Sequence, residues 1–260
     1  MSQVLNDTYD IECELGGGGG GTVYKAWHKR LRKNVVIKKL NHTKFVSEES
    51  RRNEVEALKN LKSAHLPQVL DFLTEQEQSY TVMEFIEGDS FNKLLKQNNK
   101  FSQYRVIEWY GQLASALVEL HSHDICHSDI KPANIMLMPN GKVCLIDFNV
   151  AVVKGNDTRL VSRSRGYTSP EQCKLFEQHK NRDKSNCSNI DWKLSDIHSL
   201  GATMYHILTG KQLKYDLKNS GQAEPSPCLF IIERSTHPNP NNRFASAVAL
   251  NHTIQSLLSA

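Results

Sequence analysis

Three acidic or amide side chains and one lysine lie at the two ends of a predicted β-hairpin. Asp129 lies five residues before Asn134, with Lys131 between them, and Asp147 follows the next apolar run. A tight turn at Gly141 would bring the outer ends of the hairpin together. Asn134 and Asp147 could then face one volume, where two oxygen ligands suit a hard cation such as magnesium. The nearby carboxylate of Asp129 suits accepting a proton from a hydroxyl, although a polar hairpin with ordinary turn residues is the alternative.

The same residues carry a resemblance to a known family. HSDIKPAN, which starts at His127, and the later DFN, which starts at Asp147, resemble the catalytic loop (HRDxKxxN) and metal motif (DFG) of eukaryotic-type protein kinases, including bacterial serine/threonine kinases. The resemblance implies that Asp129 is the catalytic base and that Lys131 neutralises charge on the γ-phosphate of ATP. It also implies that Asn134 and Asp147 hold Mg²⁺.

The resemblance covers about residues 9–257 and implies an α+β, two-lobed protein-kinase fold. The N-terminal lobe, residues 1–87, would hold a five-stranded antiparallel sheet plus one helix, and residues 88–260 would form a mainly helical lobe. Alternating apolar patterns and turn signals predict strands at Tyr9–Leu15, Thr22–Trp27, Val35–Lys38, Gln68–Leu73 and Ser79–Ile86. Apolar stripes and capping residues predict helices at Ser47–Leu61, Ser90–Gln97, Ser102–His121 and Val248–Leu258. Residues 174–189 are expected to form an exposed insertion, and residues 211–227 are expected to be loop-like.

A run of glycines separates the first two predicted strands. Gly16, Gly18 and Gly21 fit the pattern G-x-G-x-x-G, which lets backbone amides approach phosphate oxygens. The motif alone is weak, because a flexible hinge would satisfy it too. Here a strand follows the glycines, which resembles the kinase arrangement rather than the dinucleotide fingerprint that opens a helix. The implied nucleotide-binding residues are Leu15, Gly16, Gly17, Gly18, Gly19, Gly20, Gly21, Thr22, Val23, Lys38, Met83, Glu84 and Ile86.

Two further catalytic residues are implied in the N-terminal lobe. Lys38 ends the run VVIK, which resembles the kinase VAIK, and would contact the α- and β-phosphates. Glu54, on the predicted helix, matches the glutamate that pairs with this lysine, and Glu56 is its competitor. Met83 would lie beside the adenine as the gatekeeper, while backbone groups of Glu84 and Ile86 would bond its edge.

A second set of motifs lies after the catalytic loop. The segment ending in SPE resembles the activation segment of bacterial serine/threonine kinases, and Ser164 matches the threonine that supports the catalytic aspartate. Asp196 matches the buried aspartate that braces the catalytic loop. Arg243 matches the arginine that pairs with Glu171. This framework favours protein serine or threonine over tyrosine, and over small molecules, as the phosphate acceptor.

The chain departs from the family pattern at two positions. Ser128 replaces the arginine of HRD, which normally gathers a phosphate on the activation segment, so activity without such phosphorylation, or another route of control, is expected. Asn149 replaces the glycine of DFG. Asparagine is the next most tolerant residue at positive φ, so the loss of conformational freedom is partial.

Composition excludes several other classes of protein. With 39% hydrophobic and 23% charged residues the chain should be globular, and a net charge of +4 does not argue for nucleic acid. The cysteines are scattered without a CxxC pair, which predicts reduced thiols in a cytoplasmic protein, and no apolar run or signal peptide predicts a membrane segment. His121, His123 and His127 cluster in the sequence, but His127 is better explained as the loop histidine than as a zinc ligand.

The sequence therefore predicts an ATP- and Mg²⁺-dependent protein kinase that transfers the γ-phosphoryl group to Ser or Thr hydroxyls of protein substrates. The alternative is a pseudokinase, which would bind nucleotide or a partner without transfer. The presence of Lys38, Glu54, Asp129, Asn134 and Asp147 together favours the enzyme. The sequence does not indicate the protein substrate or the oligomeric state.

Overall fold

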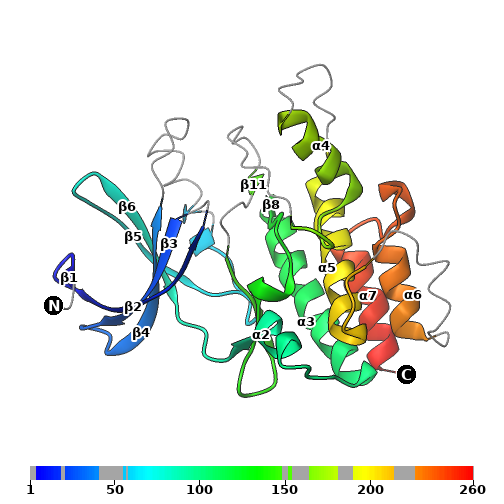
Figure 1. The fold of residues 1–260 in the computed structure, drawn as a ribbon, viewed down its shortest axis with the longest axis horizontal. Helices are drawn as coiled ribbons and strands as arrows, with labels where there is room; N and C mark the ends of the chain where they lie inside the picture. The colour runs from blue at the N-terminus through cyan, green and yellow to red at the C-terminus, as the bar shows by residue number, and fades with distance from the viewer. Residues whose placement is uncertain are drawn as a thin grey trace. The chain divides into compact units, whose positions relative to one another are not determined.

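The computed structural model describes residues 4–18, 21–40, 55–56, 58–147, 152–153, 164–180, 190–213 and 226–259 (Figure 1). The chain divides into two compact units. The first contains the chain up to Lys62 together with Leu66–Glu87, and the second contains Ser63–His65 and most of the chain from Gly88 onward. Among the helices within these ranges, none is long and apolar enough to cross a bilayer.

The first unit is an antiparallel sheet whose strand order is β1-β2-β3-β4-β6-β5. The five predicted strands are present, and the fold class is confirmed. They are β2 (Tyr9–Gly18), β3 (Gly21–His28), β4 (Lys33–Leu40), β5 (Val69–Glu75) and β6 (Gln78–Glu84). A short additional strand, β1 (Val4–Leu5), pairs with the start of β2, because Leu5 gains complete burial there.

One face of this sheet carries the core of the first unit. Tyr9, Ala26, Val35, Ile37, Tyr80 and Val82 are buried there together with Leu5 and Leu73. Side chains alternate between the two faces of β4, so Val35 and Ile37 point to the same side, and both are fully buried in this core. Of the predicted helix Ser47–Leu61, residues 55, 56, 58 and 59 are helical and Leu61 lies beyond its end, while most of the remainder falls outside the described residues.

The two strands extend into the glycine run, beyond the predicted bounds Tyr9–Leu15 and Thr22–Trp27. Gly16–Gly18 continue β2, Gly21 begins β3, and Gly18 pairs with Gly21. Strand pairing continues here because the ladder needs only backbone groups. At Gly21 the backbone has φ +140°, and a Cβ atom would lie 2.0 Å from the carbonyl oxygen of Lys39 on β4. Only glycine fits this close approach between strands.

The second unit is mainly helical, as predicted. Its helices are α2 (Phe91–Lys96), α3 (Gln103–Ser122), α4 (Pro170–Lys180), α5 (Trp192–Thr209), α6 (Pro227–Ser235) and α7 (Ala247–Leu258), with 3₁₀ turns at Pro132–Asn134 and Pro240–Asn242. Helix α3 packs against α5 and α7, and α5 packs against α6, as Figure 1 shows. Ser90 and Ser102 cap α2 and α3, as their sequence positions predict.

Short strands attach the predicted hairpin to these helices. Strands β9 (Ile135–Leu137) and β10 (Val143–Leu145) form the hairpin, with β7 (Asp89–Ser90) on its outer side, and β8 (Ile125–Cys126) pairs with β11 (Val152–Val153). Gly141 occupies the turn at φ +79°, the left-handed conformation that glycine accommodates.

The expectation of an exposed insertion at residues 174–189 is wrong for its first part. Helix α4 continues to Lys180, and Leu175 is buried against Cys126, Ile190 and Trp192. The segment is polar, but a single leucine on the inner face of a short helix suffices to anchor it. Residues 181–189 fall outside the described residues, as do residues 214–225 of the expected loop.

Candidate active site

The carboxylate of Asp129 is held on both of its oxygen atoms. Lys131 Nζ lies 2.7 Å from Oδ2, and the Ser164 hydroxyl donates to Oδ1 at 2.6 Å. Lys131 also donates to Ser164 Oγ at 3.3 Å, which closes a triangle of three side chains. A carboxylate has about four acceptor positions, so this one can still accept a hydrogen bond from a substrate hydroxyl. The contact between Ser164 and Asp129 is the one that the sequence implies.

Asn134 and Asp147 lie at adjoining ends of the hairpin. The Ile146 N–H donates to the Asn134 carbonyl at 2.8 Å, which brings the residue before Asp147 against the end of the 3₁₀ turn. The side-chain amide nitrogen of Asn134 donates to the Asp129 carbonyl at 2.9 Å. That bond turns Asn134 Oδ1 away from Asp129, as a cation ligand requires. The two residues therefore offer an amide and a carboxylate oxygen, which is a donor set that fits Mg²⁺.

A buried carboxylate fixes the loop that precedes Asp129. Asp196, on α5, is 1% exposed and accepts the backbone N–H groups of His127 and Ser128, both at 2.8 Å. His121 Nε2 lies 3.0 Å from the same carboxylate. This is the bracing contact that the sequence implies for Asp196, and it is made to the backbone rather than to a side chain of the loop.

The three neighbouring histidines do not converge on one ion. His121 contacts Asp196, His123 contacts the Glu119 carbonyl, and the His127 ring lies 3.1 Å from the Ile146 carbonyl. His121 Nε2, Cys126 Sγ and an Asp196 oxygen do lie within 4.8 Å of one another. However, burial raises the pKa of the Cys126 thiol, and Asp196 already accepts two backbone N–H groups. The geometry favours a structural role for this group.

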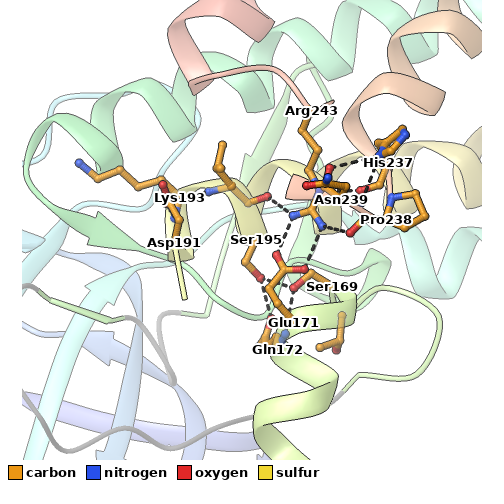
Figure 2. A network of polar contacts seen from close by, with 12 residues as sticks. Ser169, Glu171, Gln172, Asp191, Lys193, Ser195, His237, Pro238, Asn239 and Arg243 are labelled. Atoms are coloured by element: carbon orange, nitrogen blue, oxygen red, sulfur yellow. Dashed lines mark hydrogen bonds and ion pairs between the residues drawn. The ribbon is translucent and has the colours of Figure 1, made fainter. Parts of the chain in front are cut away.

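An ion pair joins α4 to the segment after α6. Arg243 Nη1 and Nη2 lie 2.7 and 2.9 Å from the two carboxylate oxygens of Glu171, as Figure 2 shows. The guanidinium also donates to the carbonyls of His237, Leu194 and Pro238. Burial alone would raise the pKa of Glu171, but the bonds from Arg243 outweigh it, and the pKa lies below its usual value. The pair implied by the sequence is therefore present and bidentate.

Several of the predicted nucleotide-binding residues share one face of the sheet in the first unit. Val23 pairs with Lys38, and Val36 pairs with Met83, so these side chains lie on the face opposite the core. Lys38 and Met83 are nonetheless 6% and 8% exposed. Leu15, by contrast, is 51% exposed.

The other predicted nucleotide-binding residues within the described ranges lie in the β2–β3 hairpin or at the end of β6. Gly16, Gly17, Gly18, Gly21 and Thr22 lie in the β2–β3 hairpin. Glu84 ends β6, and Ile86 follows it outside regular secondary structure. The Glu84 N–H donates to the Gln68 carbonyl at 2.9 Å, so a bond from Glu84 to an adenine edge would fall to its carbonyl.

Glu54, Gly19, Gly20 and Asn149 lie outside the described residues. The competitor of Glu54, Glu56, pairs with Lys59 at 2.8 Å on the surface of its helix. The roles given to these residues stay predictions.

Two sets of contacts are not apparent from the motifs. The indole N–H of Trp109 and the guanidinium of Arg105, one turn apart on α3, both donate to the Gly141 carbonyl and so hold the hairpin turn. Their spacing of four residues places them on one helix face, which is the only local signal. The second set surrounds Gln172, which follows directly after the SPE motif and donates to the Ser128 carbonyl.

Comparison with known proteins agrees with this geometry. Residues 9–259 match the family model described as the protein kinase domain. The chain is 32% identical to a probable serine/threonine-protein kinase of Clostridium acetobutylicum over 83% of this chain and 32% of that protein. It is 30% identical to the human serine/threonine-protein kinase Nek5 over 97% of this chain and 36% of that protein, and 26% identical to PknL of Mycobacterium tuberculosis over 98% and 67%. The chain thus spans about a third of the length of the first two relatives. The match over nearly its whole length shows that the chain belongs to the protein kinase domain family.

Proposed function

We propose that this chain is a serine/threonine protein kinase domain that transfers the γ-phosphoryl group of Mg-ATP to protein hydroxyls. One observation carries the proposal: Asp129 is held on both oxygens by Lys131 and Ser164, with Asn134 bonded to its backbone. A base whose carboxylate is fixed in this way can orient a hydroxyl for in-line attack. The printed names of the relatives support the same class of acceptor.

The residues of the second unit would divide the work as follows. Asp129 would accept the hydrogen bond of the incoming hydroxyl and hold its proton at a carboxylate oxygen. Lys131, whose ammonium is already beside that carboxylate, would offset negative charge on the transferred group. Asn134 Oδ1 and the Asp147 carboxylate would hold Mg²⁺, which would neutralise negative charge on the phosphates.

The first unit would bind the nucleotide. Lys38 would contact the α- and β-phosphates and pair with Glu54, and the backbone amides of the glycine run would approach phosphate oxygens. Val23 and Met83 would supply apolar surface for the adenine. Their place on the face of the sheet opposite the core supports this assignment.

This chain lacks the arginine that usually takes part in control by phosphorylation of the activation segment. Ser128 stands where the family has an arginine, and its hydroxyl is buried without a hydrogen-bond partner among the described residues. It cannot supply a cation for a phosphate. We therefore propose that activity does not require such a phosphate.

The test is phosphoryl transfer from labelled ATP with magnesium to a generic basic substrate, with Asp129→Asn beside the wild type. Incorporation by the wild type only, with Mg-ATP raising the melting temperature of both proteins, would support the proposal. No incorporation by the wild type, while Mg-ATP still raises its melting temperature, would overturn it in favour of the alternative, a nucleotide-binding module without transfer.

A further inference from the structure

Ser128, the residue directly before Asp129, has an unusual backbone. Its φ is +64°, a left-handed conformation that residues with a Cβ atom rarely adopt. Both of its backbone polar groups are bound by side chains. Its N–H donates to Asp196 Oδ1 at 2.8 Å, and its carbonyl accepts from Gln172 Nε2 at 2.9 Å. A conformation of this kind persists only where its surroundings hold it, and here two side chains do so.

Gln172 is itself held in place. Its Oε1 accepts from the Ser195 hydroxyl at 3.0 Å, and Ser195 Oγ lies 2.7 Å from Ser169 Oγ. Ser169 Oγ in turn accepts the backbone N–H of Gln172. Figure 2 shows these three side chains together between α4 and α5. Because the Ser128 carbonyl can only accept, the amide nitrogen of Gln172 must face it, and Oε1 then faces the Ser195 hydroxyl, which can donate.

The network is sealed from water. Gln172 is 1% exposed, and Ser169 and Ser195 are fully covered. A buried side-chain amide whose oxygen and nitrogen are both hydrogen-bonded is held in one position. If the Ser128 carbonyl lost this donor, it would be a buried carbonyl without a hydrogen bond from Gln172. The Ser128 carbonyl belongs to the same peptide group as the Asp129 N–H. Any rotation of that peptide group therefore moves the base.

We propose that Gln172 is a positioning residue for Asp129: it holds the Ser128–Asp129 peptide group in its left-handed turn and thereby sets the place of the base. The inference rests on the proposed function for its kinetic consequence, but its structural consequence can be measured without activity. The amide nitrogen of Gln172 donates to the Ser128 carbonyl, so Gln172 acts on Asp129 through the backbone. A displacement of about 1 Å at a reacting group can lower a rate by about a hundredfold.

The experiment compares Gln172→Met with the wild type in the full chain. Methionine keeps the length of the side chain and removes the donor. We expect kcat to fall by about ten- to a hundredfold, with the KM for ATP changed by less than about twofold, because the nucleotide contacts are elsewhere. We also expect faster amide hydrogen exchange in the peptide covering residues 125–133. Ser195→Ala removes the hydroxyl that binds Gln172 Oε1 and Ser169 but keeps the bond from Gln172 to Ser128, so it should shift both quantities in the same direction by a smaller amount.

The matched control is Ile254→Ala on α7, where a fully buried side chain far from the loop in sequence is cut back. It lowers stability without touching the network, so kcat and exchange at residues 125–133 should stay near those of the wild type. A kcat and an exchange rate in Gln172→Met and Ser195→Ala equal to those of the control would overturn the inference. If the wild type transfers no phosphate, the proposed function fails, and the exchange measurement still decides the role of Gln172.

Discussion

At the scale of single residues, Ser164 positions the proposed base, Asp129, as much as Lys131 does. The hydroxyl of Ser164 lies 2.6 Å from Asp129 Oδ1, and its carbonyl accepts from the backbone N–H groups of Tyr167 and Thr168. The residue is therefore fixed by its own turn, and it transmits that fixed position to the base. Because Ser164 is a small hydroxyl residue, a threonine can replace it and keep the same bond.

The first prediction concerns this bond. Ser164→Ala should lower kcat by about ten- to a hundredfold, since the base loses the shortest of its orienting contacts, whereas Ser164→Thr should keep most of the activity. Steady-state kinetics of both variants with labelled ATP check this. If Ser164→Ala and Ser164→Thr have the same kcat, the hydroxyl does not orient Asp129.

His198, on α5, is a buried group that the proposed mechanism does not use. It is 1% exposed, and its ring nitrogens lack hydrogen-bond partners of good geometry within the described chain. Burial, and then the positive charge of Arg243, lower its pKa from 6.5 to about 4, against smaller opposing effects of Glu171 and the Tyr167 backbone. The folded chain therefore keeps this ring neutral at a pH where the unfolded chain protonates it.

The second prediction follows from the sign of that shift. As the pH falls below 6.5, the unfolded state binds a proton that the folded state does not, so stability is lost. From the two pKa values, His198 should cost about 2 kcal/mol at pH 5 and almost nothing at pH 7.5. Urea unfolding of His198→Phe at both pH values should show a loss of stability on acidification that is smaller by about this amount. An unchanged difference between the two pH values would contradict it.

At the scale of elements, the β2–β3 hairpin requires a glycine at position 21. Gly21 combines φ +140° with a Cβ position only 2.0 Å from the Lys39 carbonyl oxygen. Gly17, in the same run, has its nearest neighbours at 3.6 Å, which is an ordinary contact distance. The two positions look alike in the sequence, but they differ in what a side chain would meet.

The third prediction uses this difference. Gly21→Ala should destabilise the first unit by about 2–4 kcal/mol, because β3 and β4 must separate to admit the methyl group, while Gly17→Ala should change stability by less than about 1 kcal/mol. Unfolding of the two variants, followed through the fluorescence of Trp27 on β3, measures both changes. Equal stabilities would mean that the close approach at Gly21 can relax at no cost.

Elements with local signals could be predicted from the sequence, and those that depend on distant partners could not. The serines at 90 and 102 mark the starts of α2 and α3 because a cap and its helix are neighbours in the chain. Strand β1 has no such signal, since two residues become a strand only by pairing with β2. Helix α4 was not predicted, because its buried apolar residue, Leu175, gains its burial from Ile190 and Trp192, which are distant in the sequence.

The same distinction between local and distant contacts applies to the residues of the candidate site. Asp129, Asn134 and Asp147 could be placed together from the sequence because one hairpin connects them. The bond from Gln172 to Ser128 joins residues 44 positions apart, and spacing within a motif gives no information about it. Residues that orient a base through buried polar contacts are thus the part of the site that requires a structure.

At the scale of the molecule, the second unit is fastened by the pair between Glu171 and Arg243, 72 positions apart. The Arg243 side chain is fully covered and the Glu171 side chain is 19% exposed, and the guanidinium also binds backbone carbonyls of α5 and of the segment before Pro240. Exposed pairs such as Lys93 with Asp89 differ, because water solvates both partners when the bond breaks. An ion pair should therefore contribute more to stability at the buried site of Arg243 than at the exposed site of Lys93.

The last prediction compares these sites through one type of substitution. Arg243→Met should lower the free energy of unfolding by about 3–5 kcal/mol, because it leaves the Glu171 carboxylate largely buried without its partner. Lys93→Met should lower it by less than about 1 kcal/mol. Urea unfolding at pH 7.5 measures both.

The pH dependence of stability tests whether the unpaired Glu171 carboxylate causes the loss of stability in Arg243→Met. Arg243→Met removes the bonds and the positive charge of Arg243 that lower the pKa of Glu171. Burial, the largest single influence, still raises this pKa, against the smaller lowering effects of the Ser169 and backbone hydrogen bonds, so we expect the folded pKa to lie above the unfolded value of 4.5. A carboxyl with a raised folded pKa stabilises the fold below its unfolded pKa and loses that contribution as the pH rises through the folded pKa. The deficit of Arg243→Met relative to the wild type should therefore shrink between pH 7.5 and pH 5, and Glu171→Leu combined with Arg243→Met should recover part of it at pH 7.5. A deficit that is independent of pH, and that Glu171→Leu does not reduce, would show that Arg243 acts through its packing and its carbonyl contacts rather than through the ion pair.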